Sequence, residues 1–299
     1  MFFGAERGAK KPSGEPVNAA GGTLSLPARL PALVRLFAEA YVPSTGGYLV
    51  PPNSSMGHFG EADVSNWRKK FASEPQYDSV ELEVASFLYS LVRMTGVKRV
   101  LETGCSRGFS TSFLATGVID NGGGRVISID ADDLFHLWES SEIENIITFI
   151  NGNSLDAVGQ VRNLLDGEEF DLLFLDSLHT YAHLMAEIML YERLLKTGGM
   201  IVLHDTLFYD CLAPVVMHLR ECPRFEVITV PSPRRHAHET RCPGVTIATK
   251  IDNDVERHPL RMSQAYFCWA SSSMNLPEYA GRNPSSEPLL EIMRREKKL

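Results

Sequence analysis

The stretch VLETGCSRGFST, residues 100–111, decides the fold. It begins as a short apolar run and then places an acid, Glu102, and two glycines, Gly104 and Gly108, among small polar residues. Because glycine has no Cβ, Gly104 lets the backbone turn tightly and Gly108 lets the next helix begin close to a ligand. We therefore expect a strand that ends in a ligand-binding turn and is followed by a helix.

Similar apolar runs recur along the chain and alternate with segments of helical character. The runs are KRVLETG, RVISIDAD, IITFING, FDLLFLDS and MIVLHDT. Apolar runs without strict alternation are typical of strands covered on both faces, and strand–helix alternation implies a parallel sheet with right-handed crossovers. FEVITV (225–230) and GVTIATK (244–250) permit an antiparallel closing pair. The predicted fold class is α/β, a doubly wound, Rossmann-like sheet.

The chain divides into three predicted parts. Residues 1–28 are rich in Gly, Ala, Pro and Lys without an apolar period, which predicts a flexible arm. Residues 29–252 form the main domain, with N-terminal cap helices in 29–95 and the ligand-binding core in 96–252. Residues 253–299 form a C-terminal extension with a short helix at 288–297.

Composition excludes several classes of protein. The net charge of −8 offers no concentrated basic face, which argues against a nucleic-acid partner. Five cysteines without a CxxC spacing argue against a disulfide framework. No run approaches the roughly 20 apolar residues that cross a bilayer. We expect a cytoplasmic protein with no membrane partner.

The turn after the first strand differs from a dinucleotide site, which would carry GxGxxG. Here an acid precedes GxxxG, and a carboxylate facing the ligand would repel pyrophosphate but attract an ammonium or sulfonium group. This pattern resembles the first motif, E/DxGxxxG, of class I S-adenosylmethionine-dependent methyltransferases. The resemblance implies a seven-stranded class I methyltransferase sheet, with Glu102 facing the charged end of the cofactor and the loop of Gly104, Ser106 and Gly108 packing against its methionine part. A plain strand end is the alternative.

Two further strand ends carry cofactor candidates. Asp130 ends the second strand, where an acid suits hydrogen bonds to both ribose hydroxyls, a geometry shared with dinucleotide folds. After the third strand comes Asn153, which by the resemblance lies close to the adenine amino group. A helix N-cap is an equally acceptable interpretation of Asn153.

The fourth and fifth strands end in Asp176 and in the pair His204 and Asp205. Parallel strands end at one edge of a sheet, so these side chains converge, and two carboxylates with an imidazole can hold a divalent cation. Mg²⁺ prefers oxygen ligands, which leaves open Mn²⁺, Fe²⁺, or a supporting position for His204. Asp176 is also a candidate cofactor-binding residue. The alternative to the metal site is that Asp176 and Asp205 only cap helices and contact the cofactor.

The run 174–206 resembles the metal-dependent macrocin and mycinamicin O-methyltransferases, grouped with cephalosporin-hydroxylase-like proteins, in which a DxxH signature follows the fourth strand. This resemblance implies Mg²⁺ or Mn²⁺ on Asp176 and Asp205, with His204 in a place often held by an acid. It also makes His179 the general base, beside Asp176 in the catalytic centre. Imidazole titrates near neutral pH, which suits a base that removes a hydroxyl proton. A surface or capping histidine is the alternative.

Two loops, 48–60 and 231–244, are candidates for the acceptor pocket, because loops at this edge commonly set substrate choice. Arg234, Arg235, His236 and His238 could attract an anionic acceptor, or simply be solvated. Family members often assemble, so a homo-oligomer is expected, and the N-terminal segment forms either a lid or a dimer contact.

The predicted function is S-adenosylmethionine-dependent, metal-assisted O-methylation of a small-molecule hydroxyl, such as a sugar, secondary metabolite or phenol. Three rivals remain: metal-independent methylation of nitrogen or a carboxylate, a nicotinamide-dependent oxidoreductase, and a non-catalytic ligand-binding protein. The missing GxGxxG counts against the oxidoreductase.

Overall fold

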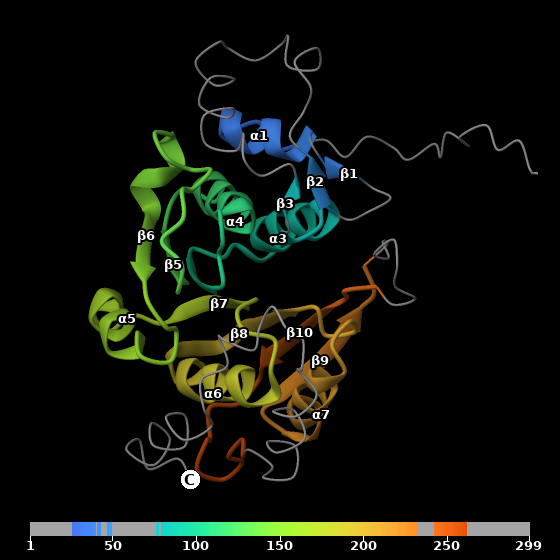
Figure 1. Ribbon diagram of the computed structural model, residues 1–299. Coiled ribbons are helices and arrows are strands. Elements are labelled where there is room, and N and C mark those ends of the chain that lie inside the picture. The colour runs from blue at the N-terminus through green and yellow to red at the C-terminus, as the bar shows by residue number, and fades with distance from the viewer. Residues whose placement is uncertain are drawn as a thin grey trace, which may run out of the picture.

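The computed structural model describes residues 26–39, 41–42, 47–49, 76–77, 79–232 and 242–261. Its centre is a seven-stranded sheet with helices on both faces (Figure 1). The strands are β4 (Arg99–Thr103), β5 (Arg125–Asp130), β6 (Ile147–Asn151), β7 (Phe170–Leu175), β8 (Leu195–His204), β9 (Phe225–Val230) and β10 (Val245–Lys250).

The strand order is β6-β5-β4-β7-β8-β10-β9. Neighbours from β6 to β8 pair in parallel, whereas β10 is antiparallel to both β8 and β9. The doubly wound sheet and the antiparallel closing pair are therefore confirmed. Within this sheet the first strand in the chain is the central β4. The next two, β5 and β6, extend the sheet to one side, and β7 then pairs with the other side of β4. This reversal of strand order is where open α/β sheets bind ligands, beyond the carboxyl ends of the strands.

Successive strand residues pack on opposite faces of the sheet, which explains the continuous apolar runs. Val100 and Val202 belong to the core shared with α3 (Leu82–Thr95) and α4 (Phe109–Asp120). Leu101 and Leu203 face the other core. That face is covered by α5 (Val158–Leu165), α6 (Tyr181–Tyr191) and α7 (Ala213–Glu221), below the sheet in Figure 1.

The N-terminal part adds α1 (Ala32–Glu39) and a small antiparallel sheet of β1 (Tyr41–Val42), β2 (Gly47–Leu49) and β3 (Gln76–Tyr77). The helix α1 lies within the range predicted for N-terminal cap helices, and its Val34 and Phe37 are buried in the α3–α4 core. The small sheet was not predicted. Three 3₁₀ turns complete the described elements: η2 (Glu142–Ile146), η3 (Glu192–Leu194) and η4 (Asp210–Leu212).

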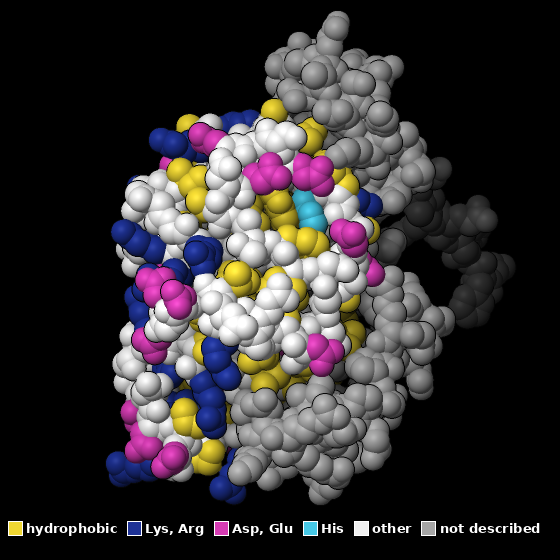
Figure 2. All heavy atoms as spheres, turned by 90° about the vertical axis from the view of Figure 1, so that its left-hand side faces the viewer, with side chains coloured by type: hydrophobic (Ala, Val, Ile, Leu, Met, Phe, Trp, Pro, Cys, Tyr) yellow, Lys and Arg dark blue, Asp and Glu magenta, His cyan; other side chains and the backbone are white. Residues whose placement is uncertain are grey.

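Several predictions lie wholly or largely outside the described residues: the arm, most of the loops 48–60 and 231–244 with their arginines and histidines, and the helix at 288–297. The division into arm, domain and extension stays a prediction. Within the described part of the chain, no helix is long and apolar enough to cross a membrane. On the face shown in Figure 2, acidic and basic side chains are interspersed.

Candidate active site at the carboxyl edge of the sheet

The glycine turn after β4 is fixed by close packing. Gly104 and Gly108 both have left-handed backbone angles, with φ of 79° and 77°. A Cβ on Gly104 would lie 2.2 Å from the backbone oxygen of Asp176, so this turn touches the loop after β7. A Cβ on Gly108 would overlap the ring of Trp138 at 1.8 Å. The space that we expected Gly108 to leave for a ligand is therefore filled, at its Cβ position, by a tryptophan.

Glu102 does not face an open site. Its side chain is fully buried, pointing to the α4 side, where its carboxylate accepts hydrogen bonds from Ser110 at 2.5 Å, from Ser128 at 2.9 Å and from Thr111. Burial raises its pKa to about 7, against the effect of the three hydroxyls. The sequence placed Glu102 against the charged end of the cofactor. The enclosed carboxylate supports the turn by joining β4, β5 and α4, and its predicted contact with the cofactor stays a prediction.

Asp130 holds the turn from the end of β5. Its carboxylate accepts from the backbone N–H of Ser106 at 2.7 Å and from that of Asp132 at 2.9 Å. Asn153 forms a local turn, in which its side-chain oxygen accepts from the N–H of Leu155 at 2.9 Å. This contact is a local turn and does not make Asn153 the N-cap of the next helix, because α5 begins at Val158 and its N-cap residue is Ala157. Asp130 and Asn153 both lie at the carboxyl edge, and their predicted contacts with ribose and adenine stay predictions.

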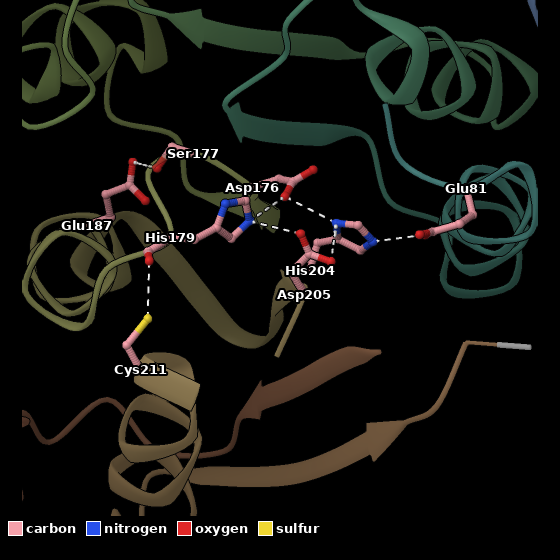
Figure 3. A network of polar contacts seen from close by, with 8 residues as sticks. All are labelled: Glu81, Asp176, Ser177, His179, Glu187, His204, Asp205 and Cys211. Carbon is pink, nitrogen blue, oxygen red and sulfur yellow. Dashed lines mark hydrogen bonds and ion pairs between the residues drawn. The ribbon is translucent and has the colours of Figure 1, made fainter. Parts of the chain in front are cut away.

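A cluster of possible metal ligands forms where β7 and β8 end. Nε2 of His179 lies 3.1 Å from Oδ1 of Asp176 and 3.4 Å from Oδ2 of Asp205. One ligand atom from each of the three residues lies within 4.8 Å of the others. Figure 3 shows the three side chains pointing toward one another. The predicted convergence of these strand ends is confirmed.

These residues fit a divalent cation. All three side chains are partly buried, and two carboxylates with one imidazole are a donor set that such ions accept. Oδ1 of Asp205 is buried and has no hydrogen-bond donor among the described residues; its nearest cationic group is Nδ1 of His204, at an ion-pair distance of 3.7 Å. A buried carboxylate oxygen without a donor is costly, and a bound cation would remove that cost.

His204 lies behind this cluster. Its Nδ1 is 3.2 Å from Oδ1 of Asp176 and its Nε2 is 3.1 Å from Oε2 of Glu81, so both ring nitrogens already face carboxylates. This geometry favours the supporting position for His204 and makes His179 a further candidate ligand, and the metal ligands stay a prediction. The position of His204 follows from strand alternation, because this residue points to the same face as Val202, toward the start of α3. Asp205 leaves the strand with a φ of 58°.

The acids and histidines of the cluster shift one another's pKa values. Burial raises the pKa of Asp176, but the imidazoles of His204 and His179 outweigh it and lower that pKa to about 2. Burial lowers the pKa of both histidines, but the neighbouring carboxylates outweigh it, so that the pKa of His179 is raised and that of His204 is raised well above its usual value. Burial raises the pKa of Asp205. A cation would therefore compete with protons for this site.

A known protein family matches the part of the chain that forms this edge of the sheet. Residues 101–206, from β4 to the end of the candidate cluster, match the family described as "Methyltransferase domain". Residues 101–206 are thus similar to a methyltransferase domain, and the sheet that contains them has the class I methyltransferase fold.

Relatives and solved structures support the same domain. The chain is 28% identical over 141 residues to Tapetum-specific methyltransferase 1 of Arabidopsis thaliana, covering 44% of this chain and 57% of that protein. It is 28% identical over 144 residues to caffeoyl-CoA O-methyltransferase of Populus kitakamiensis, covering 46% and 59%. The chain thus spans less than two thirds of the length of either relative.

Two solved structures share the fold. The O-methyltransferase from Bacillus cereus in complex with SAH has a TM-score of 0.53 and 19% identity, covering 73% of this chain and 99% of that one. The cofactor-bound protein Rv0187 from MTB has a TM-score of 0.53 and 22% identity, covering 67% and 94%. These structures confirm the predicted class I methyltransferase fold.

The surroundings of the candidate site also include residues that sequence reasoning missed. Glu81 lies 123 positions from its partner His204, and nothing in the sequence links them. Tyr209 stacks on the ring of His179, with centroids 4.6 Å apart and planes at 18°. Glu187 did carry a signal, because it is the lone acid in the helix YAHLMAEIMLY, which is mostly apolar apart from His183.

Proposed function

We propose that this protein transfers the methyl group of S-adenosylmethionine to a hydroxyl oxygen of a small molecule, with the help of a divalent cation. One observation carries the proposal: Asp176, His179 and Asp205 converge beside the glycine turn that is expected to hold the cofactor. The contact of Gly104 with Asp176 brings the two regions together. The relatives named as O-methyltransferases support the same reaction.

Cofactor binding would use the backbone of the glycine turn together with Asp130 at the end of β5 and Asn153 in the loop after β6. Ser106 and Asp130 are already hydrogen-bonded to each other at the turn, which presents a fixed surface. Such a surface loses little entropy on binding, which favours affinity. Asp130 would accept from the ribose and Asn153 would lie near the adenine.

Asp176 and Asp205 would hold the cation, either Mg²⁺ or Mn²⁺. Bound there, a cation lowers the pKa of a coordinated hydroxyl and fixes its orientation. The chain itself would position the acceptor oxygen in line with the methyl group, since positioning accounts for a large part of such rate enhancements.

His179 has two candidate roles in the proposed reaction. As the general base it would accept the proton of the acceptor hydroxyl at Nε2. The same atom faces both carboxylates, however, so it is also placed as the third ligand. The variant His179→Ala separates the two roles: a lost base lowers turnover with unchanged Mn²⁺ affinity, whereas a lost ligand weakens Mn²⁺ binding.

The test of the function begins with calorimetry of the purified protein with S-adenosylhomocysteine, which is expected to bind. Methyl transfer to a panel of hydroxylated sugars and phenols should stop in EDTA and return with Mg²⁺ or Mn²⁺. Full activity in EDTA would favour nitrogen or carboxyl methylation instead, and binding of NAD in place of S-adenosylhomocysteine would favour the oxidoreductase. The homo-oligomer, which light scattering measures, and the cytoplasmic location stay predictions.

A further inference from the structure

A second buried acid–histidine cluster lies outside the proposed catalytic centre. Glu187 on α6 is fully buried, and its Oε1 accepts from the hydroxyl of Ser177 at 2.8 Å and from that of Ser154. Nε2 of His183, one turn earlier on the helix, lies 3.3 Å from the same oxygen. Figure 3 shows Glu187 reaching up to Ser177 from the helix below.

The two serines belong to different loops. Ser154 follows Asn153 in the loop after β6, and Ser177 follows Asp176 in the loop after β7. In the sheet, β5 and β4 separate β6 from β7, so these strands lie roughly 14 Å apart at about 4.8 Å per strand. One carboxylate oxygen therefore joins two loops that start from distant strands. The hydroxyl of Tyr191, also on α6, donates to the backbone oxygen of Ser154 and strengthens one of these links.

This cluster is not a nucleophilic triad. A Ser–His–Glu relay needs the serine on one ring nitrogen and the acid on the other. Here Ser154 and Glu187 both approach Nε2 of His183, at 3.2 Å and 3.3 Å. Nδ1 of His183 is buried and has no hydrogen-bond partner among the described residues. The arrangement can hold loops in place, but it cannot activate Ser154.

We infer that Glu187 is a positioning residue, which sets the distance between the loop of Asn153 and the loop of Asp176 and so shapes the cofactor site from behind. The inference rests on the proposed function, in which these two loops border the cofactor. Hydrogen bonds to an ionised carboxylate are about twice as strong as neutral ones, so a charged anchor holds the hydroxyls more firmly than an amide would.

The charge of Glu187 agrees with this role. Burial raises its pKa, but the His183 imidazole and the two serine hydroxyls outweigh it, so the pKa is lowered. Burying an ionised group is expensive unless it is well paired. Oε2 of Glu187 lacks a hydrogen-bond partner within the described residues, so part of that cost remains. An apolar residue would remove this cost but would release both loops.

The first test uses the protein without cofactor. Glu187→Gln should speed amide hydrogen exchange about tenfold in both 152–157 and 176–180, because a neutral amide holds the hydroxyls less firmly. The matched control is Glu192→Gln. Glu192 is similarly buried at the end of the same helix, but within the described residues its carboxylate pairs with Arg224 at 2.8 Å and has no hydrogen bond to either loop. The control should melt earlier while both loops keep their wild-type protection.

The second test measures affinity for S-adenosylhomocysteine well below the melting temperatures. Glu187→Gln should weaken binding about tenfold, whereas Glu192→Gln should leave it within about twofold. Wild-type exchange rates in either loop of Glu187→Gln, or equal acceleration in the control, would overturn the inference. Failure of the wild-type protein to bind would instead overturn the proposed function, since the exchange test needs no cofactor.

Two milder variants keep the inference testable if Glu187→Gln does not fold. Ser154→Ala removes one link and should speed exchange in 152–157 alone. Ser177→Ala removes the other and should speed exchange in 176–180 alone. If each variant loosens both loops or neither, Glu187 does not connect them in the way proposed.

Discussion

The ends of neighbouring strands β4 and β7 carry acids with opposite surroundings. The carboxylate of Glu102 is fully enclosed by the hydroxyls of Ser110, Thr111 and Ser128, and its pKa is raised to about 7. The carboxylate of Asp176 meets two imidazoles, and its pKa is lowered to about 2. The two strands pair directly, so their different environments come from the side chains around each carboxylate.

This difference distinguishes Glu102, an acid that supports the structure, from Asp176, an acid proposed to bind a cation. Neutral hydroxyls satisfy a carboxylate's lone pairs without neutralising its charge, so an enclosed acid such as Glu102 gains protons easily and serves the structure. Imidazoles keep Asp176 ionised and can be displaced or deprotonated when a cation arrives. A motif acid is therefore a ligand candidate only where cationic or exchangeable partners surround it.

The contact between the two regions can be broken at Gly104. Gly104→Ala should lower the free energy of unfolding by about 4 kcal/mol, of which about 1 comes from the left-handed φ and about 3 from overlap with the backbone of Asp176. Gly122→Ala is the matched control, because Gly122 has a φ of 92° and nothing within 4 Å of its added Cβ. It should lose only about 1 kcal/mol. Urea denaturation measures both, and equal losses would refute the contact.

Removal of the proposed ligand should separate the two acids most clearly. Asp176→Asn should weaken Mn²⁺ binding roughly 100-fold or more, since even outer partners of a metal ligand contribute about 10-fold to 100-fold. Glu102→Gln, the same change in the enclosed acid, should leave Mn²⁺ affinity within about twofold. Calorimetry with Mn²⁺ alone measures both. Equal losses in the two variants would mean that the structure misassigns their roles.

The raised pKa of Glu102 predicts a pH dependence of stability. In the unfolded chain this carboxyl has its ordinary pKa of 4.5, so between pH 4.5 and about 7 the folded protein binds more protons than the unfolded one. Stability from this group is therefore greatest below pH 4.5 and is lost as the pH rises toward 7. The nearby charge of Asp176 adds to the raised pKa.

Glu102→Gln should remove that dependence. Relative to the variant, the wild-type protein should lose on the order of 2 kcal/mol of unfolding free energy between pH 4.5 and 7. Urea denaturation at several pH values gives the two curves. Glu168→Gln, a change at an exposed glutamate, should give a curve parallel to the wild type. If the Glu102→Gln curve is also parallel, the carboxyl is already ionised at pH 4.5.

The sheet and the convergence of its strand ends could be predicted because both follow from local pattern. Apolar runs identify strands, and parallel connections put the ends holding Asp130, Asp176 and Asp205 on one edge. The choice between His204 and His179 needed one further step. Counting alternate residues back from His204 to Val202 shows which face it takes, but only the structure shows that α3 covers that face.

Contacts between distant segments could not be predicted. Glu81 meets His204 across 123 positions, and Trp138, in the segment that follows β5 in the chain, fills the space beside Gly108. Neither leaves a periodic trace in the sequence. The small N-terminal sheet escaped prediction for a different reason, because strands of two or three residues are too short to show an alternating pattern.

The smallest expected effect concerns Glu81. It contacts His204, which in turn contacts the ionised Asp176. Glu81→Gln should weaken Mn²⁺ binding about tenfold, because His204 would lose the carboxylate that orients its ring toward Asp176. Glu83→Gln, two positions along on α3, is the control and should bind Mn²⁺ like the wild type. If the two variants bind Mn²⁺ equally, the backbone of β8 alone holds His204 in place, and the contact with Glu81 does not contribute to metal binding.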